Sequence, residues 1–107
     1  MMNTNWLLID DKRNVAGVES IARTYKEGKD AILRGGWATI IFDHDLGDTN
    51  PKHTGYDLMC ILEEHPELIP ENIMLITDNP VGLQKMEVLR IRLYDMRNSM
   101  YFNDLQD

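Results

Sequence analysis

The stretches Trp6-Leu7-Leu8-Ile9-Asp10-Asp11 and Thr39-Ile40-Ile41-Phe42-Asp43-His44-Asp45-Leu46-Gly47 decide the fold of this chain. Each is an uninterrupted apolar run of strand length that stops on acidic residues. Such runs are typical of strands buried on both faces of a parallel sheet. Ligand crevices in open α/β sheets lie beyond the carboxyl ends of the strands. Four carboxylates are therefore expected to meet at one sheet edge: those of Asp10, Asp11, Asp43 and Asp45.

These acids also have a simpler interpretation. An Asp side chain after a strand often accepts hydrogen bonds from nearby backbone amides, as a turn former or helix cap. One acidic pair would favour a turn, but two pairs at the ends of two apolar runs favour a ligand site. Like charges held together need a counter-ion, and a hard cation such as Mg²⁺ with a phosphate behind it is the usual one.

Composition limits the class of protein. The 107 residues suit one domain with a single core. A net charge of −7 argues against general nucleic-acid binding and against binding to anionic membranes, since both need a basic surface. The only cysteine, Cys60, cannot form an internal disulfide and is expected to be a small buried hydrophobe. With no signal peptide and no apolar stretch near 18 residues, we expect a cytoplasmic protein.

Strands and helices alternate along the chain. Strands are expected at about 5–10, 18–23, 37–43 and 73–77, and helices at 25–33, 56–64 and 80–97. Thr24 with Glu27 predicts a capping box, and Gly35-Gly36 predicts a helix end. This alternation predicts a three-layer α/β fold, with a mostly parallel four-stranded sheet of order 2-1-3-4 and helices on both faces. It occupies one domain, residues 1–98, followed by a tail at 99–107.

The first connection and the last helix are unusual. Only about seven residues separate the first two strands, fewer than a parallel crossover normally needs, so either a helix has shrunk there or the second strand is misplaced. In the last helix, an apolar stripe is predicted to cover a sheet face, with basic residues on or beside the solvent side. The stripe is Leu83, Met86, Leu89, Leu93 and Met96, and the basic residues are Lys85, Arg90, Arg92 and Arg97.

The arrangement of these residues resembles the receiver domain of response regulators. By that resemblance Asp10 and Asp11 would hold Mg²⁺, and Asp43 would be the phosphorylated aspartate. Asp45 would fall where the metal usually takes a backbone carbonyl, and Thr77 would bind a phosphoryl oxygen.

A narrower resemblance covers about residues 6 to 90. Five motifs resemble the signature of the cyclic-phosphate processing receiver domains, which are small bacterial and phage proteins. The motifs are Leu8-Ile9-Asp10-Asp11, Arg23-Thr24, Phe42-Asp43-His44-Asp45-Leu46-Gly47, Thr54-Gly55-Tyr56-Asp57 and Asp78-Asn79-Pro80-Val81-Gly82.

The chain departs from an ordinary receiver after its fourth strand. An ordinary receiver has a fifth strand ending in a Lys that pairs with the phosphorylated acid, and then a fifth helix. Here only one long helix and a tail follow, and the last lysine is Lys85. The resemblance therefore implies a truncated receiver-like (flavodoxin-like) fold that lacks strand 5 and helix 5, and it weakens a role in two-component signalling.

The chemistry expected of the site centres on Asp10, Asp11 and Asp43. They close adjacent strands and are predicted to bind one Mg²⁺, which would polarise a phosphoryl oxygen and orient a water. Asp43, His44 and Asp45 are the candidate catalytic residues, with His44 as a proton shuttle. Strand alternation would point His44 away from the two acids, which favours a structural role instead.

Four further residues are candidates for binding the phosphate. Arg23 closes the second strand, where a guanidinium could grip a phosphate bidentately or pair with the acids. Asn79 and the amide of Gly82 lie at the start of a helix, an anion site that plain capping would also explain. Thr77 is a candidate by the receiver resemblance.

Three functions follow from this reading. The first is a metal-dependent phosphoesterase or phosphate-ligand-binding domain for cyclic phosphates or nucleotides. The second is a phosphoacceptor that uses Asp43. The third is a non-catalytic protein that sequesters a nucleotide or binds a partner, for which Met100-Tyr101-Phe102 would suit docking. The expected ligand is a small phosphorylated molecule, such as a cyclic nucleotide or a cyclic-phosphate end.

Overall fold

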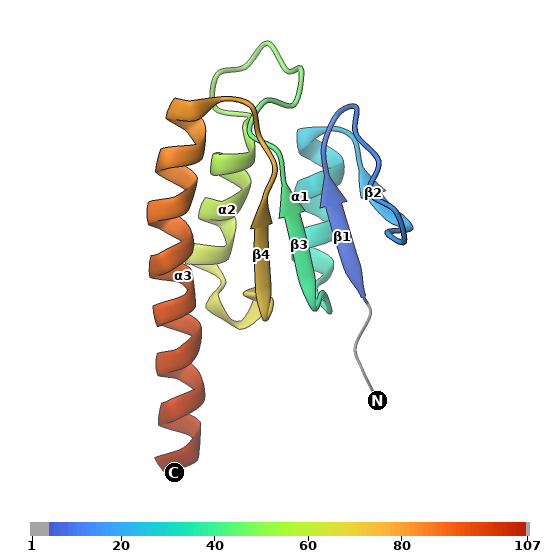
Figure 1. Ribbon diagram of the computed structural model, residues 1–107. Helices are drawn as coiled ribbons and strands as arrows, with labels where there is room; N and C mark the ends of the chain where they lie inside the picture. Colours follow the sequence, from blue (N-terminus) through green and yellow to red (C-terminus); the bar gives the residue numbers. More distant parts are fainter. Residues whose placement is uncertain (1–4, 107) are drawn as a thin grey trace.

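The computed structural model describes residues 5–106 of the chain, with the side chains of residues 5–100. Four short strands alternate with helices, as Figure 1 shows. The strands are β1 (Trp6–Ile9), β2 (Ser20–Ala22), β3 (Thr39–Phe42) and β4 (Asn72–Leu75). The helices are α1 (Tyr25–Arg34), α2 (Gly55–Glu64) and α3 (Pro80–Gln106), with the 3-10 turn η1 (Pro66–Leu68) before β4.

The strands form one parallel sheet with the order β2-β1-β3-β4. This confirms the predicted α/β class and strand order, and it places the second strand as predicted, though shorter. Ile9 at the end of β1 lies beside Phe42 at the end of β3. The residues that follow them, Asp10 and Asp43, are therefore neighbours at the carboxyl edge of the sheet.

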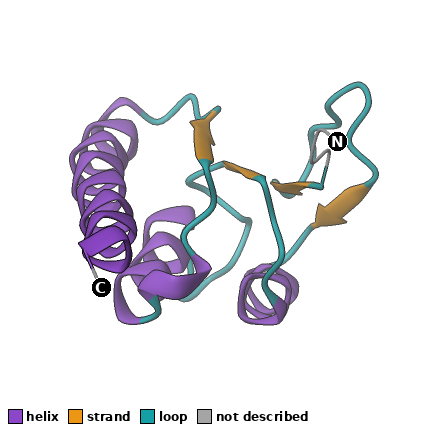
Figure 2. Cartoon of the chain, turned by 90° about the horizontal axis from the view of Figure 1, so that it is seen from below, coloured by secondary structure: helices purple, strands orange, loops and turns teal. Residues whose placement is uncertain are grey.

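All three helices lie on one face of the sheet, as Figure 2 shows. Parallel crossovers are right-handed, and the β2–β3 and β3–β4 connections advance in the same direction across the sheet, so α1 and α2 share a face. Only the β1–β2 connection runs the opposite way, and residues 10–19 contain no helix. The predicted third layer, with helices on both faces, was therefore wrong. The β1–β2 connection would have to place a helix on the second face, and it contains no helix.

The two faces are consequently buried by different parts of the chain. Side chains of β1, β3 and β4 that face the helices join the main core with residues of α1, α2 and α3. On the other face, Leu8 and Ile41 are buried in a small cluster to which Val15 and Val18 of the β1–β2 segment contribute. Met74 of β4, further along that face, is 42 % exposed.

The first two helices begin at side-chain caps. The Thr24 hydroxyl accepts a hydrogen bond from the Glu27 amide, as predicted, but the Glu27 carboxylate accepts from Arg23 N and not from Thr24 N. Helix α2 begins with a complete capping box between Thr54 and Asp57. Helix α1 ends as predicted at Gly35, whose N–H donates to the carbonyls of two residues in the last turn.

Helix α3 buries the middle of its predicted stripe, with Met86, Leu89 and Leu93 at most 2 % exposed, whereas Leu83 and Met96 are half-buried. It packs on α2, η1 and β4, so it extends the helical layer that α1 and α2 form. It does not cover the opposite face of the sheet, where Met74 is exposed. The helix also continues to Gln106, past Arg97 where we expected it to end. Most of the predicted tail is therefore helical, and the docking role of Met100-Tyr101-Phe102 falls largely outside the described side chains.

Helix α3 also closes part of the free edge of β4. The Tyr94 hydroxyl accepts the N–H of Ile73 at 2.7 Å and donates to its carbonyl at 3.3 Å. The Arg90 guanidinium donates to the same carbonyl at 3.3 Å. Both backbone groups of Ile73 are thus paired without a further strand. Among the described residues, no helix has both the length and the apolar character needed to cross a membrane.

Candidate functional site

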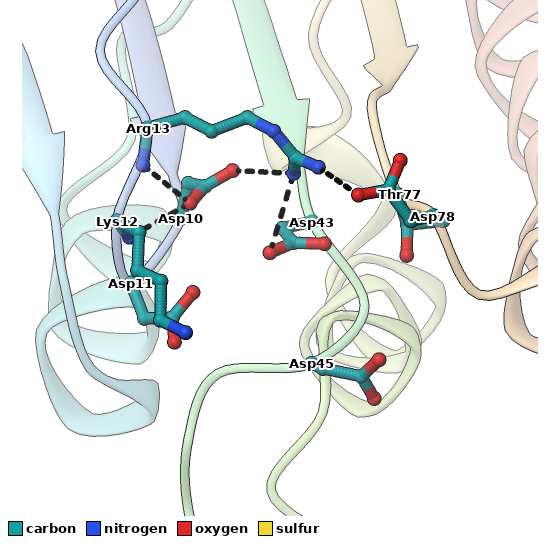
Figure 3. Close-up of a pocket in the computed structure, with 8 residues that line it drawn as sticks. All are labelled: Asp10, Asp11, Lys12, Arg13, Asp43, Asp45, Thr77 and Asp78. Atoms are coloured by element: carbon teal, nitrogen blue, oxygen red, sulfur yellow. Dashed lines mark hydrogen bonds and ion pairs between the residues drawn. The ribbon is translucent and has the colours of Figure 1, made fainter.

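Three carboxylates converge where β1 and β3 end. Asp10, Asp11 and Asp43 each offer an oxygen that lies within 4.8 Å of the oxygens of the other two. The geometric prediction for these acids is therefore confirmed, and oxygen ligands at this spacing fit a hard divalent cation such as Mg²⁺. They line a cavity of about 260 Å³, shown in Figure 3, together with Lys12, Arg13, Asp45, Thr77 and Asp78.

Asp10 is fully buried, yet its environment favours the ionised form. Burial raises the pKa of Asp10, but hydrogen bonds from the amides of Arg13 and Lys12, together with the Arg13 guanidinium, outweigh it and bring the pKa below its ordinary value. Both amides donate to Oδ1 at 2.8 Å. The turn interpretation of this acid is therefore confirmed, and because the amides use only Oδ1, a role for Oδ2 in a ligand site stays a prediction.

Asp43 is in the opposite electrostatic situation. It is 7 % exposed, and this burial, together with the charge of Asp10, raises its pKa. The amide of His44, which donates to Oδ1 at 2.8 Å, offsets the effect only in part, as do Arg13 and the Thr77 hydroxyl. The negative charge at Asp43 is thus undercompensated, which is the condition that a bound cation would relieve.

Asp45 lines the cavity, but His44 does not. Strand β3 has already ended at Phe42, so strict alternation no longer fixes where His44 points. Its ring lies against the start of α3, where a Cβ on Gly82 would come within 2.5 Å of it. His44 Nδ1 lies 2.9 Å from Asp45 Oδ1. This geometry supports the structural interpretation of His44, and its catalytic role stays a prediction.

Asn79 caps helix α3. Its Oδ1 accepts from the amide of Gly82 at 2.9 Å, and its carbonyl accepts from Leu83 N. Its own amide donates to the Thr77 hydroxyl at 3.1 Å. The predicted anion site at Asn79 and Gly82 is thus already used for capping. Of the predicted phosphate ligands, only Thr77 lines the cavity.

Arg23 binds protein backbone near the site and does not line the cavity. Its guanidinium donates to the carbonyl of Asp10 at 3.2 Å, to that of Arg13 at 2.5 Å, and to the side chain of Asn14. These bonds fix the segment that follows β1. The structure thus gives Arg23 neither a carboxylate partner nor a place in the cavity, and phosphate binding by this residue stays a prediction.

Arg13 is the principal site residue that the sequence analysis missed. Its Nη1 lies 3.1 Å from Asp10 Oδ2 and 3.6 Å from Asp43 Oδ2, and its Nη2 lies 2.7 Å from Asp78 Oδ2 (Figure 3). Two features of the sequence could have indicated it: clustered acids need a counter-ion, and Arg13 is a cation only three residues after Asp10. Lys12 and Asp78 also line the cavity and were not predicted.

Comparison with known families agrees with this geometry. The family model for the cyclic-phosphate processing receiver domain matches residues 6–90. The match begins at β1 and ends within α3, so it includes every residue that lines the cavity. Neither the curated proteins nor the solved structures provide a match. Because the family model covers most of the chain, the chain belongs to the family of cyclic-phosphate processing receiver domains, and its parallel sheet of order β2-β1-β3-β4 agrees with a receiver-like fold.

Proposed function

We propose that this protein is a Mg²⁺-dependent phosphoesterase, or at least a phosphate-ligand-binding domain, acting on cyclic phosphates of the nucleotide type. The convergence of the three carboxylates within 4.8 Å in one cavity carries this proposal. The raised pKa of Asp43 supports it, because its charge lacks full compensation. The family to which the chain belongs supports a ligand that contains phosphate.

Each residue of the cavity has a role in this proposal. Asp10, Asp11 and Asp43 would hold the cation, which when bound polarises a phosphoryl oxygen and lowers the pKa of a coordinated water. The Thr77 hydroxyl, which hydrogen-bonds Asp43 in this structure, would turn to donate to the phosphoryl group, and Lys12 would supply positive charge beside it.

The proton transfer would fall to Asp45. Its carboxylate lines the cavity and is oriented by His44 and by Asn79, whose Nδ2 lies 3.4 Å from Asp45 Oδ2. A carboxylate held in this way can accept a proton from the attacking group. In this arrangement His44 is a positioning residue and not a direct shuttle.

A phosphoacceptor role for Asp43 is the second candidate. One observation favours it: Asp43 lies at the cavity with the Thr77 hydroxyl and the Arg13 guanidinium beside its carboxylate, so a phosphoryl group on it would meet a donor and a cation. A protein that sequesters a nucleotide without chemistry, or passes it to a partner protein, is the third.

The deciding experiment measures Mg²⁺-dependent turnover of a panel of cyclic and linear nucleotides. Asp11→Asn and Asp43→Asn should each lower turnover by about 10²–10³-fold or more, the usual cost of removing one electrostatic contact to the reacting group. Asp30→Asn is the matched control, because Asp30 is an exposed carboxylate on α1 that forms an i,i+4 surface pair with Lys26 and does not line the cavity. Asp57 suits this purpose less well, since it belongs to the capping box of α2.

The outcomes separate the three candidates. Stoichiometric labelling by a small phosphodonor, lost in Asp43→Asn and without turnover, would favour the phosphoacceptor. Nucleotide binding without chemistry in any metal would favour the sequestering protein. If wild-type protein binds neither Mg²⁺ nor any phosphate ligand, the proposal is wrong.

We also propose a cytoplasmic location, where nucleotide ligands occur. Cys60 is a free thiol packed at the edge of the core, and burial raises its pKa. A thiol of raised pKa is a poor nucleophile, so Cys60 serves as a packing residue and needs no oxidising compartment.

A further inference from the structure

The guanidinium of Arg13 is the counter-ion of the acid cluster in this structure. Besides its contacts to Asp10 and Asp43, its Nη1 donates to the carbonyl of Ile76 at 2.8 Å, and its Nη2 pairs with Asp78. Figure 3 shows the group extended between the ends of β1, β3 and β4. One side chain thus joins three strand ends at the cavity.

The oxygens that Arg13 contacts are the ones left for a cation. Asp10 Oδ1 already accepts two backbone amides, and Asp43 Oδ1 accepts the amide of His44. The second oxygen of each carboxylate, Oδ2, faces Nη1 of Arg13. Since metal–oxygen bonds to Mg²⁺ are about 2.1 Å long and like charges repel strongly at short range, the guanidinium and a cation at these oxygens exclude each other.

The side chain of Arg13 can leave while its backbone stays in place. The side chain is 38 % exposed, and its partner Asp78 is 95 % exposed, so their ion pair is a weak surface contact. The contacts of Arg13 to the buried Asp10 and Asp43 are the ones that a bound cation would replace. The backbone is fixed separately, because the Arg13 amide donates to Asp10 and the Arg13 carbonyl accepts from Arg23. A guanidinium displaced from the acids therefore remains at the cavity.

We infer that Arg13 couples metal binding to phosphate binding. Without a cation it offsets part of the negative charge of Asp10 and Asp43, and once a cation has taken those oxygens it turns to bind the phosphate group of the ligand. The planar fork of arginine suits this second task, since it can donate two parallel hydrogen bonds to phosphate oxygens. The inference rests on the proposed function, and it adds a regulatory step to the same site.

Calorimetric titration of Arg13→Gln tests both parts. Mg²⁺ should bind the variant about tenfold more tightly than wild type, because the competing guanidinium is gone. Inorganic phosphate, titrated at saturating Mg²⁺, should bind about tenfold more weakly, the loss expected for one charge-assisted contact. Lys26→Gln is the matched control: it makes the same change in net charge at an exposed position on α1, and should leave both affinities at wild-type values.

Arg13→Lys keeps the positive charge but removes the fork, and it retains a folded reference if Arg13→Gln is unstable. It should bind Mg²⁺ as wild type does and phosphate more weakly. If Arg13→Gln or Arg13→Lys leaves phosphate binding unchanged, or if Arg13→Gln does not tighten Mg²⁺ binding, the inference is overturned while the proposed function stands. Failure of both wild type and Arg13→Gln to bind Mg²⁺ would overturn the inference and the proposed function together.

Discussion

The two faces of the sheet are formed by the same strands, but the segments that cover them differ in their roles in stability and in the site. On one face, α1, α2 and α3 bury a continuous core, most of it away from the cavity. On the other face, Val15 and Val18 of the β1–β2 segment cover Leu8 and Ile41, and the same segment carries Asp11 and Arg13. The first face therefore separates stability from the site, whereas the second joins them in one short stretch of chain.

The largest expected effect is on the helical face. Leu89→Ala should lower the free energy of unfolding by about 2–5 kcal/mol, because Leu89 is 2 % exposed within the main core. Mg²⁺ affinity of the folded variant should not change. Urea unfolding and calorimetry measure the two quantities.

Val88→Ala is the control for this position, since Val88 is the adjacent residue of α3 and is 59 % exposed. It should change stability by less than about 0.5 kcal/mol, as surface substitutions usually do. A similar small effect of Leu89→Ala would mean that α3 does not pack on the core.

A smaller loss of stability, with a change at the site, is expected on the second face. Val18→Ala should cost about 1–2 kcal/mol, at roughly 0.8 kcal/mol for each buried carbon removed. Because Val18 anchors the segment that holds Asp11 and Arg13, this variant should also weaken Mg²⁺ binding. Equal Mg²⁺ affinity in Val18→Ala and Leu89→Ala would break the distinction between the two faces.

The smallest effect concerns the two buried acids, Asp10 and Asp43. Asp10 accepts two backbone amides of the β1–β2 segment, whereas the amide that Asp43 accepts is that of His44. The folded-state pKa of Asp43 is raised above 3.8, so this residue makes stability fall as pH rises from 3.8 through that pKa. The folded-state pKa of Asp10 is lowered, so its ionised form adds stability above pH 3.8, which is lost as pH falls through the lower value.

In the presence of a chelator at pH 7, Asp43→Asn should therefore be more stable than wild type and Asp10→Asn less stable. Urea unfolding at a series of pH values should show both differences shrinking as the pH falls through the folded-state pKa of the residue replaced. If both variants had a higher free energy of unfolding than wild type at pH 7, or both a lower one, the two carboxylates would not lie in opposite electrostatic environments.

The features of this structure that follow from residues adjacent in the sequence could be predicted from the sequence alone. Apolar runs located the strands, and the acids after Ile9 and Phe42 had to meet once those strands were adjacent. Asp10, Asp11 and Asp43 were found in this way. The layer arrangement was missed, although the right-handed crossover rule and the lack of a helix between β1 and β2 together give it.

Other features depend on where long side chains reach, which residue spacing does not specify. Arg23 was expected either to grip a phosphate or to pair with the acids, but its guanidinium donates to backbone carbonyls of the segment beyond β1. The same segment carries Arg13, whose side chain extends across the cavity to Asp10 and Asp43. Helix α3 was predicted to end near Arg97, yet no Gly or Pro follows that residue to stop it, and the helix continues to Gln106.

The pairing of Ile73 with Tyr94 and Arg90 has a consequence for how this molecule can associate. An unprotected edge strand is a template for strand addition, by which peptides bind and sheets grow into aggregates. At the middle of β4 the N–H and carbonyl that would recruit such a strand are already bonded to side chains of α3. Strand addition is therefore opposed at the middle of β4, which favours β2, at the opposite edge, for a partner that binds by extending this sheet.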